Sequence, residues 1–192
     1  MKNLNICIDI DGTITDAYYW LNPCNEYFNT NVTEEQVTEY SIHKVLNIDE
    51  AEYLKFYESN KFKIHSDQDL RDDAKSVIKK LSLLNNIYFV TARDKSLTML
   101  THGYLRKNEI PYEDLFVLGS HYKVDTAKDL ECDVFIEDNY DNAIQLSNAG
   151  FKVLLVDTNY NRKPINENII RVYNWSEVYT IINKLLLQSK AM

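Results

Sequence analysis

The feature that most constrains the fold is residues 6–16, which read ICIDIDGTITD. Isoleucine at three alternate positions predicts a β-strand, because successive side chains of a strand point to opposite faces. The same alternation places Asp9 and Asp11 on one side of the chain, where the apolar run ends at Gly12. Two carboxylates this close repel each other and need a shared proton or a cation. A hard divalent ion such as Mg2+ would serve both.

A β-hairpin is the alternative interpretation of this run. Asp-Gly between alternating segments favours a tight turn, in which Gly12 supplies a positive φ. A hairpin accounts for Gly12 but leaves unexplained an aspartate facing a core strand at Asp9. At ordinary residue frequencies, Asp-x-Asp-Gly-Thr occurs by chance in roughly one in a thousand chains of this size. We therefore interpret residues 9–13 as part of a functional site.

Strand-like and helical patterns alternate from about residue 66 to the end of the chain. The expected strands after the first share a short apolar run and cover residues 87–90, 115–118, 134–136 and 151–156. The expected helices share an amphipathic pattern and cover residues 66–84, 94–110, 141–149 and 176 onward. This alternation predicts an α/β fold with a Rossmann-like parallel sheet of about five strands and helices on both faces. In such folds ligands bind beyond the carboxyl ends of the strands.

Helix boundaries in this part follow from capping residues. We expect Asp94 to cap the second of these helices, Asp141 to cap the third, and Gly150 to follow the end of the third as a C′ glycine. Four acids are expected in the first turns of the helix over 66–84, where the helix dipole favours them: Asp67, Asp69, Asp72 and Asp73.

Residues 17–65 lack a long strand-like run and contain several helix starts instead. Helix starts are indicated at Asn22-Pro23, at the capping box from Thr33 to Gln36, and at Asp49. We predict a small helical cap inserted after the first strand, with residues 1–16 and 66–192 forming the core. Most aromatic residues of the insert are expected in its own core. Those nearest the acidic motif are candidates for stacking on a substrate: Tyr18, Tyr19 and Trp20.

Composition narrows the classes of partner. The 192 residues are 45% hydrophobic and carry a net charge of −8, so a nucleic-acid polymer or an anionic membrane is not expected as a partner. No stretch approaches the roughly 20 apolar residues of a membrane span, and we see no signal peptide. Three scattered cysteines without a Cys-x-x-Cys pattern favour a reduced, cytoplasmic protein.

The run at residues 9–13 resembles the nucleophile motif of the haloacid dehalogenase-like superfamily, whose members are mostly Mg2+-dependent phosphatases. The resemblance implies that Asp9 attacks phosphorus and that Asp11, two residues on, is the acid/base. Dehalogenases of this superfamily lack the second aspartate, so Asp11 argues for phosphoryl transfer. Glu137-Asp138 after the strand over 134–136 resembles the fourth motif of the superfamily, whose acids hold the metal.

The remaining motifs are less specific. Thr91 resembles the phosphate-holding hydroxyl of the second motif, and Arg93 either touches phosphate or lies on the surface. Either Lys123 or Lys128 resembles the lysine of the third motif, which stands at the start of a helix before the fourth strand. We favour Lys123, because Lys128 would fall in the middle of that helix, where a lysine usually faces solvent. The implied metal ligands are Asp9, the backbone carbonyl of Asp11, and Asp138, with Glu137 acting through water.

The cap and the segment over 135–139 are similar to the 5′(3′)-deoxyribonucleotidase-like group. We therefore expect a Mg2+-dependent phosphomonoesterase that acts on nucleoside monophosphates. One alternative is a phosphatase for another small ester, such as a sugar phosphate. A non-catalytic binding domain on the same scaffold is a more remote alternative. The sequence leaves the position of the phosphate, the sugar preference and the oligomeric state open.

Overall fold

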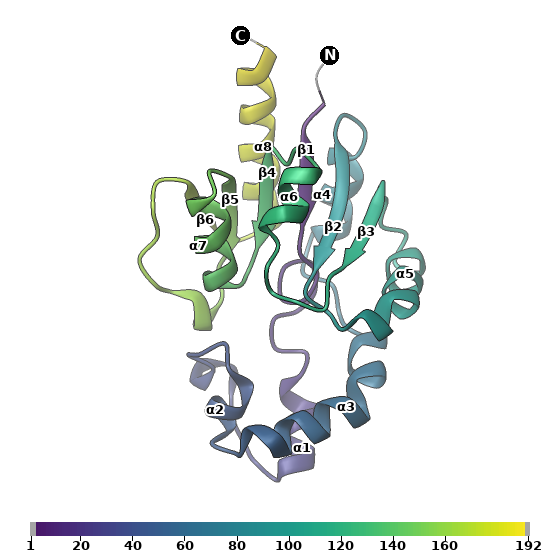
Figure 1. The fold of residues 1–192 in the computed structure, drawn as a ribbon, viewed down its shortest axis with the longest axis vertical. Helices are drawn as coiled ribbons and strands as arrows, with labels where there is room; N and C mark the ends of the chain where they lie inside the picture. The colour runs from purple at the N-terminus through teal and green to yellow at the C-terminus, as the bar shows by residue number, and fades with distance from the viewer. Residues whose placement is uncertain (1–2, 191–192) are drawn as a thin grey trace.

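The computed structural model describes residues 3–190, which form a six-stranded parallel sheet with a helical segment at one end (Figure 1). The sheet order is β3-β2-β1-β4-β5-β6, with parallel pairing throughout. The strands are β1 (Asn5–Ile8), β2 (Asn86–Thr91), β3 (Asp114–Val117), β4 (Val134–Glu137), β5 (Lys152–Val156) and β6 (Ile169–Val172). The predicted α/β class and parallel sheet are confirmed. The expectation of about five strands is one short, since the sequence pattern did not indicate β6.

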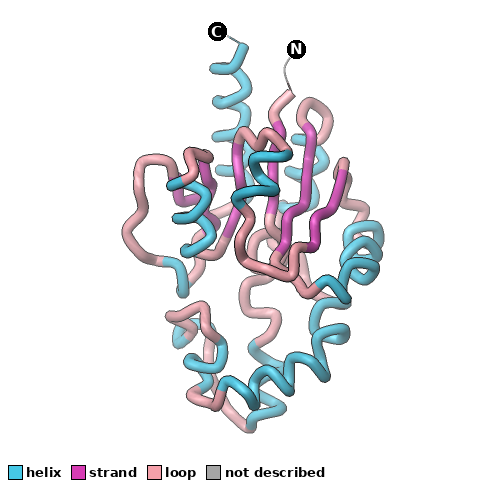
Figure 2. Tube along the Cα trace, in the orientation of Figure 1, coloured by secondary structure: helices cyan, strands magenta, loops and turns pink. Residues whose placement is uncertain are grey.

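Helices cover both faces of the sheet because the central strands are apolar on both sides. Ile6 and Ile8 pack into one core cluster with α4 (Ala74–Leu81), α5 (Thr98–Lys107) and α8 (Trp175–Lys190). Cys7, between those isoleucines, packs into the other cluster with α6 (Val124–Asp129) and α7 (Tyr140–Asn148). Figure 2 shows the strands enclosed between these helices. The alternation along β1 thus supplies both layers of the core.

The helical segment, residues 17–65 with the last residue of α3, lies at the carboxyl end of the strands, away from both termini (Figure 1). Its elements are α1 (Leu21–Phe28), η1 (Glu34–Gln36), α2 (Ile42–Leu46) and α3 (Glu50–Ser66). Trp20, Leu21, Cys24, Val37, Leu46 and Phe56 are buried together in a third hydrophobic cluster. Most of its apolar residues therefore pack within the segment itself.

The two connections to the helical segment lie side by side. Thr15 and Leu70 form an isolated antiparallel bridge. Asp16 N donates to Asp69 O at 2.9 Å, and Arg71 N donates to Ile14 O at 2.9 Å. The chain therefore enters and leaves the segment through one hydrogen-bonded neck.

The helix predicted over 66–84 is wrong at its start. α3 continues to Ser66, and α4 begins only at Ala74, after Asp73 in a left-handed conformation with φ 62°. Asp67, Asp69 and Asp72 consequently lie in the connection and not in a first helical turn. The pairing of residues 69–71 with residues 14–16 explains the difference, because these residues cannot be helical and bridge Thr15 as well.

The ends of the other helices show which of the predicted capping residues do cap a helix. Asp49 accepts hydrogen bonds from Ala51 N and Glu52 N, and Gly150 follows α7 with φ 94°, as expected. Asp94 caps a short 3-10 helix, η2 (Lys95–Leu97), which leads into α5. The predicted cap at Asp141 is wrong, because Asn139 caps α7.

Two helix starts in the inserted segment also differ from the expectation. α1 begins at Leu21, so Pro23 falls at its third position, still in the first turn where proline is tolerated. The capping box predicted from Thr33 to Gln36 is confirmed, but it begins a single 3-10 turn instead of an α-helix. Across the described residues, no helix is both long and apolar enough to cross a membrane.

Candidate active site

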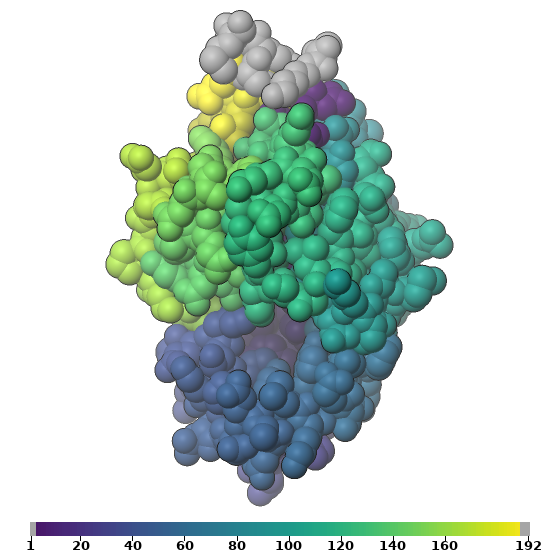
Figure 3. All heavy atoms as spheres, viewed as in Figure 1, coloured from purple at the N-terminus to yellow at the C-terminus, as the bar shows by residue number. Residues whose placement is uncertain are grey.

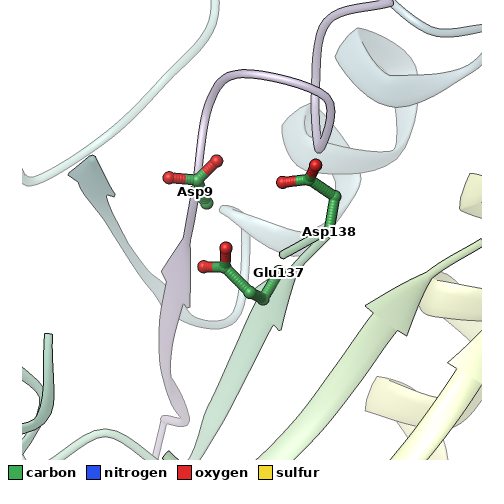
Figure 4. Close-up of side chains that lie close together, drawn as sticks. All are labelled: Asp9, Glu137 and Asp138. Carbon is green, nitrogen blue, oxygen red and sulfur yellow. The ribbon is translucent and has the colours of Figure 1, made fainter. Parts of the chain in front are cut away.

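The ends of β1 and β4 bring three buried carboxylates together. Asp9 follows β1 directly, and its N–H donates to Ile136 O at 2.9 Å, which holds it beside β4. Glu137 and Asp138 end β4 and begin the loop to α7. One oxygen from each of the three carboxylates lies within 4.8 Å of the others, as Figure 4 illustrates. The predicted convergence at the carboxyl edge of the sheet is therefore present for Asp9 and Asp138.

Lys123 supplies positive charge to this carboxylate cluster. Its Nζ donates to Asp9 Oδ1 at 2.5 Å and to Glu137 Oε2 at 2.8 Å. The side chain is 1% exposed although it belongs to a residue type that is normally on the surface. Desolvation alone would lower the pKa of Lys123, but the two carboxylates raise it above its ordinary value. Lys123 therefore keeps its positive charge beside the three carboxylates.

The three carboxyl groups outnumber the single ammonium of Lys123, and their pKa values reflect the imbalance. Burial, followed by the charges of Glu137 and Asp138, raises the pKa of Asp9 well above its ordinary value, although Lys123 acts in the opposite direction. Burial and the charge of Glu137 raise the pKa of Asp138 to about 7. Like charges in a desolvated site disfavour ionisation of every member. A cation bound between them would remove this penalty.

Asp138 is held by the loop after β1 and by a tyrosine from the loop after β5, the strand next to β4. Thr13 Oγ1 donates to Asp138 Oδ1 at 3.1 Å, and Tyr160 OH donates a short hydrogen bond to Asp138 Oδ2. Gly12 lies against the same carboxylate with φ 77°, and a Cβ there would approach Asp138 Oδ2 to 2.5 Å. Glycine is therefore required at this position by both space and conformation.

The donor set fits a hard divalent cation. Carboxylate oxygens are the ligands that Mg2+ prefers, and a doubly charged ion would offset the mutual repulsion of three carboxylates. Asp9, Glu137 and Asp138 each offer an oxygen. The Asp11 side chain is directed elsewhere, so any contribution of Asp11 to a metal would come from its backbone.

Asp11 occupies a different environment, formed with Arg93, Gln68 and His65. Arg93 Nε donates to Asp11 Oδ2 at 2.7 Å and its NH2 donates to Oδ1 at 2.8 Å. Gln68 Nε2 donates to Oδ1 at 2.7 Å, and His65 Nδ1 lies 3.3 Å from that oxygen. Burial works against ionisation here too, but Arg93 and then His65 lower the pKa of Asp11 well below its ordinary value.

The surface position that the sequence left open for Arg93 is wrong, although Arg93 does line the cavity. It is 4% exposed, so it is not a surface residue, and in this structure its guanidinium is engaged by Asp11, Gln68 and Thr101. Two parallel N–H···O bonds to one carboxylate are the geometry that arginine favours. The residue is therefore part of the support for Asp11.

A cavity of about 560 Å3 separates the sheet from the helical segment, where Figure 3 shows a hollow between them. Thr91, at the end of β2, is buried at its wall, and its hydroxyl accepts a hydrogen bond from Arg93 N at 3.3 Å. From the core, the cavity is lined by Asp9, Asp11, Thr91, Lys123, Glu137 and Asp138. The opposite wall includes Tyr19, Val37, Ile42, Tyr53, Leu54 and Tyr57. One end is thus charged and the other largely aromatic and aliphatic.

The three aromatics nearest the motif have different places. Tyr19 lines the cavity, with its ring centroid 5.7 Å from that of His65. Trp20 is buried in the core of the helical segment although part of it reaches the cavity wall, and its Nε1 donates to Ala17 O. Tyr18 accepts a hydrogen bond from Asn159 N and packs edge-on to Tyr160. Tyr19 is therefore the best placed of the three to meet a ligand.

Two residues weighed from sequence lie outside the site. Lys128 is 60% exposed and lies 4.0 Å from Asp125, so Lys123 is the lysine at the carboxylates. Asp141 lies in the first turn of α7 and is not among the clustered carboxylates. Sequence reasoning missed His65, Gln68 and Tyr160. No motif marks them, since each reaches the site from a segment remote in sequence.

Comparison with known proteins gives consistent matches along the whole chain. The sequence profile described as "5′ nucleotidase, deoxy (Pyrimidine), cytosolic type C protein" matches residues 2–192. A nucleotidase of Clostridium acetobutylicum is 65% identical over 192 residues, which is 100% of both chains.

Solved structures agree on the fold. A haloacid dehalogenase-like family hydrolase from Streptococcus pneumoniae aligns with a TM-score of 0.70 at 14% identity, covering 94% of this chain and 98% of that one. A haloacid dehalogenase-type protein of Bacillus subtilis, solved with magnesium bound, aligns with a TM-score of 0.62 at 18% identity, covering 95% and 100%. The chain therefore belongs to the 5′ nucleotidase, deoxy (pyrimidine), cytosolic type C family and is a nucleotidase-like phosphoric monoester hydrolase with the haloacid dehalogenase-like fold.

Proposed function

We propose that this protein is a Mg2+-dependent 5′(3′)-(deoxy)nucleotidase that releases phosphate from nucleoside monophosphates through an aspartyl-phosphate intermediate. The observation that carries the proposal is the contact of buried Lys123 with Asp9, beside Glu137 and Asp138, at the charged end of the cavity. A nucleophile, a phosphate-binding cation and a metal-binding pair of acids are what phosphoryl transfer requires. The nucleotidase name of the Clostridium acetobutylicum relative supports the choice of substrate.

In the first step, a carboxylate oxygen of Asp9 attacks phosphorus and the bond from phosphorus to the ester oxygen breaks. Asp11 gives a proton to the departing oxygen, so that an alcohol leaves. Lys123 and the Thr91 hydroxyl hold oxygens of the phosphoryl group. A charge-assisted contact from a buried ammonium is strong because water does not compete for it.

In the second step, water attacks phosphorus, Asp11 accepts its proton, and the bond to Asp9 breaks to release inorganic phosphate. Arg93 keeps Asp11 ionised in the structure, which is the form that this step needs. The first step needs the protonated form. The negative charge of a bound substrate raises the pKa of a neighbouring carboxyl, and this effect favours proton uptake by Asp11 before the ester bond breaks.

Asp9, Asp138 and the backbone carbonyl of Asp11 would hold Mg2+, with Glu137 beside them. When bound, the ion neutralises charge on the phosphoryl oxygens and keeps substrate and nucleophile in line. The protein supplies the dry cavity and the fixed directions of the carboxylates. Thr13, Tyr160 and Lys123 provide those directions through their hydrogen bonds.

The helical segment would act as a cap over this chemistry. Its Tyr19, Tyr53 and Tyr57 face the cavity from the side opposite the carboxylates, as a nucleobase attached to the bound phosphate would require. Base–aromatic stacking contributes about 1–3 kcal/mol and tolerates different bases.

We expect the enzyme to act in the cytoplasm, where Cys7, Cys24 and Cys132, all free and buried, stay reduced.

The direct test is phosphate release from a panel of 5′- and 3′-nucleoside and deoxynucleoside monophosphates and sugar phosphates, with Mg2+ or with excess chelator. We expect Mg2+-dependent hydrolysis with the highest kcat/KM on nucleotides. A preference for sugar phosphates would replace the proposed substrate with the alternative ester. Full activity in excess chelator would contradict the metal, and binding without turnover would leave only a binding domain.

A further inference from the structure

We propose that Gln68 is a positioning residue for Asp11. Through Gln68, the orientation of the Asp11 carboxylate depends on the end of the helical segment. The proposal rests on the catalytic role proposed above for Asp11. It extends that role to a residue outside the acidic motifs, located where the chain leaves α3 and returns to the core.

Gln68 is anchored in the core by its backbone. Its carbonyl oxygen accepts a hydrogen bond from Tyr104 OH of α5 at 2.9 Å, and the residue is 6% exposed. It directly precedes the neck, in which Asp69 and Leu70 pair with the part of the chain that leads from β1 into the helical segment. The backbone position of Gln68 is therefore defined on both sides.

The side-chain amide of Gln68 contacts both members of the Asp11–Arg93 pair. Its Nε2 donates to Asp11 Oδ1 at 2.7 Å, and its Oε1 accepts from Arg93 NH2 at 2.5 Å. The charges of the two partners assign the amide orientation, since a carboxylate only accepts and a guanidinium only donates. The glutamine amide meets both needs at once, with its NH2 group toward Asp11 and its oxygen toward Arg93.

This contact fixes the plane of the Asp11 carboxylate. Arg93 alone holds both oxygens from one side, and Gln68 adds a donor at Oδ1. His65 Nδ1 approaches the same oxygen at 3.3 Å, and its Nε2 lies 3.1 Å from Tyr57 OH. Tyr57 and His65 belong to α3, so the last donors around Asp11 come from the helical segment and its exit.

A structural role for a buried amide is the competing explanation, and leaving-group dependence separates the two. An acid that is well placed matters most when the departing oxygen is a poor leaving group. Phenyl phosphate and 4-nitrophenyl phosphate are similar in size, but the nitrophenolate leaves more easily. The ratio of kcat/KM for 4-nitrophenyl phosphate to that for phenyl phosphate therefore reports how well Asp11 delivers its proton.

The experiment measures this ratio and the melting temperature for the full chain and four variants. Gln68→Met keeps the length of the side chain but removes both hydrogen bonds, and Gln68→Glu keeps only the acceptor toward Arg93. Asp11→Asn removes the acid itself. The matched control is Asn85→Leu, which removes a buried amide that bonds Leu4 N and Leu81 O at the opposite end of the sheet.

We expect Gln68→Met and Gln68→Glu to raise the ratio by about tenfold, in the same direction as Asp11→Asn and by less, because general-acid catalysis as a whole supplies about 10²- to 10⁴-fold. Asn85→Leu should change the melting temperature but not the ratio. If Asp11→Asn raises the ratio and both Gln68 variants leave it unchanged, the positioning role is wrong while the proposed function stands. If Asp11→Asn itself leaves the ratio unchanged, the acid role fails and this inference fails with it. Should Gln68→Met not fold, Gln68→Glu alone decides the question.

Discussion

Asp9 and Asp11 are two residues apart, yet their surroundings have opposite electrostatic character. Around Asp9 the described structure gathers two further carboxylates and the ammonium of Lys123. Around Asp11 it places a guanidinium, an amide and an imidazole. Burial opposes ionisation of both, although 22% of the Asp11 side chain is exposed to the cavity. The neighbours make the difference: the pKa of Asp9 is raised and that of Asp11 is lowered.

The comparison teaches that the two regions are completed in different ways. The Asp9 region is formed by strand ends of the core and needs a cation from outside to balance it. The Asp11 region is neutralised by the protein itself and draws donors from α3 and the following residues. Titratable groups whose environments push their pKa values apart are a recurring mark of divided catalytic roles. The predictions below test that division.

The largest effect is expected from Asp9→Asn. The amide lacks the nucleophilic oxygen, so phosphate release should fall by at least about three powers of ten. The protein should remain folded, because the change leaves one fewer acidic group among three mutually repelling buried ones. Asp125→Asn, at an exposed acid on α6, is the control and should keep normal turnover. Near-normal hydrolysis by Asp9→Asn would refute the covalent mechanism.

Lys123→Met tests the positive side of the Asp9 region. Loss of a charge-assisted contact in a dry site should lower kcat/KM by about 2–4 kcal/mol, or roughly 30- to 1000-fold. Lys128→Met should be nearly silent, since that side chain is largely exposed. Steady-state phosphate release with a nucleotide measures both. The reverse outcome would transfer the phosphate contact to Lys128.

Tyr19→Ala tests whether the Asp11 region also recognises the substrate. If Tyr19 stacks on the nucleobase, kcat/KM for a nucleotide should fall by about 1–3 kcal/mol, whereas an aryl phosphate should be affected less. Melting temperature should stay near that of the unmodified protein. Tyr18→Ala is the contrast, because Tyr18 holds Asn159 and Tyr160 and its loss should lower the melting temperature. Equal losses on both substrates in Tyr19→Ala would rule out a base contact.

The smallest effect is expected in the stability of Asp138→Asn. In metal-free protein the substitution relieves repulsion from Glu137 in a desolvated site. A gain of about 1 kcal/mol corresponds to a rise of about 2–4 °C in melting temperature for a chain of this size. Adding Mg2+ should raise the melting temperature of the unmodified protein but not that of the variant. A lower metal-free melting temperature in the variant would show that Asp138 is not under electrostatic strain.

Much of the fold could be predicted because it depends on local patterns. Apolar runs located five strands, and Asp49 and Gly150 marked real helix ends. Parallel strands point their carboxyl ends to one edge, so the meeting of Asp9 with Asp138 also followed from the pattern. β6 was missed because its four residues include Arg171 and lack a longer apolar run. The start of α4 was missed because it depends on the pairing of Leu70 with Thr15.

The sequence by itself thus determined the layered α/β architecture and the acidic edge, since both follow from periodicity and from the order of strands and helices. Only the tertiary structure decided which partners surround each aspartate. Gln68 and Arg93 are 57 and 82 residues from Asp11 along the chain, and Tyr160 is 22 residues from Asp138. Such contacts depend on how whole elements pack against one another, which no local spacing encodes. For that reason the opposite acidity of Asp9 and Asp11 could not be read from a motif in which they stand two residues apart.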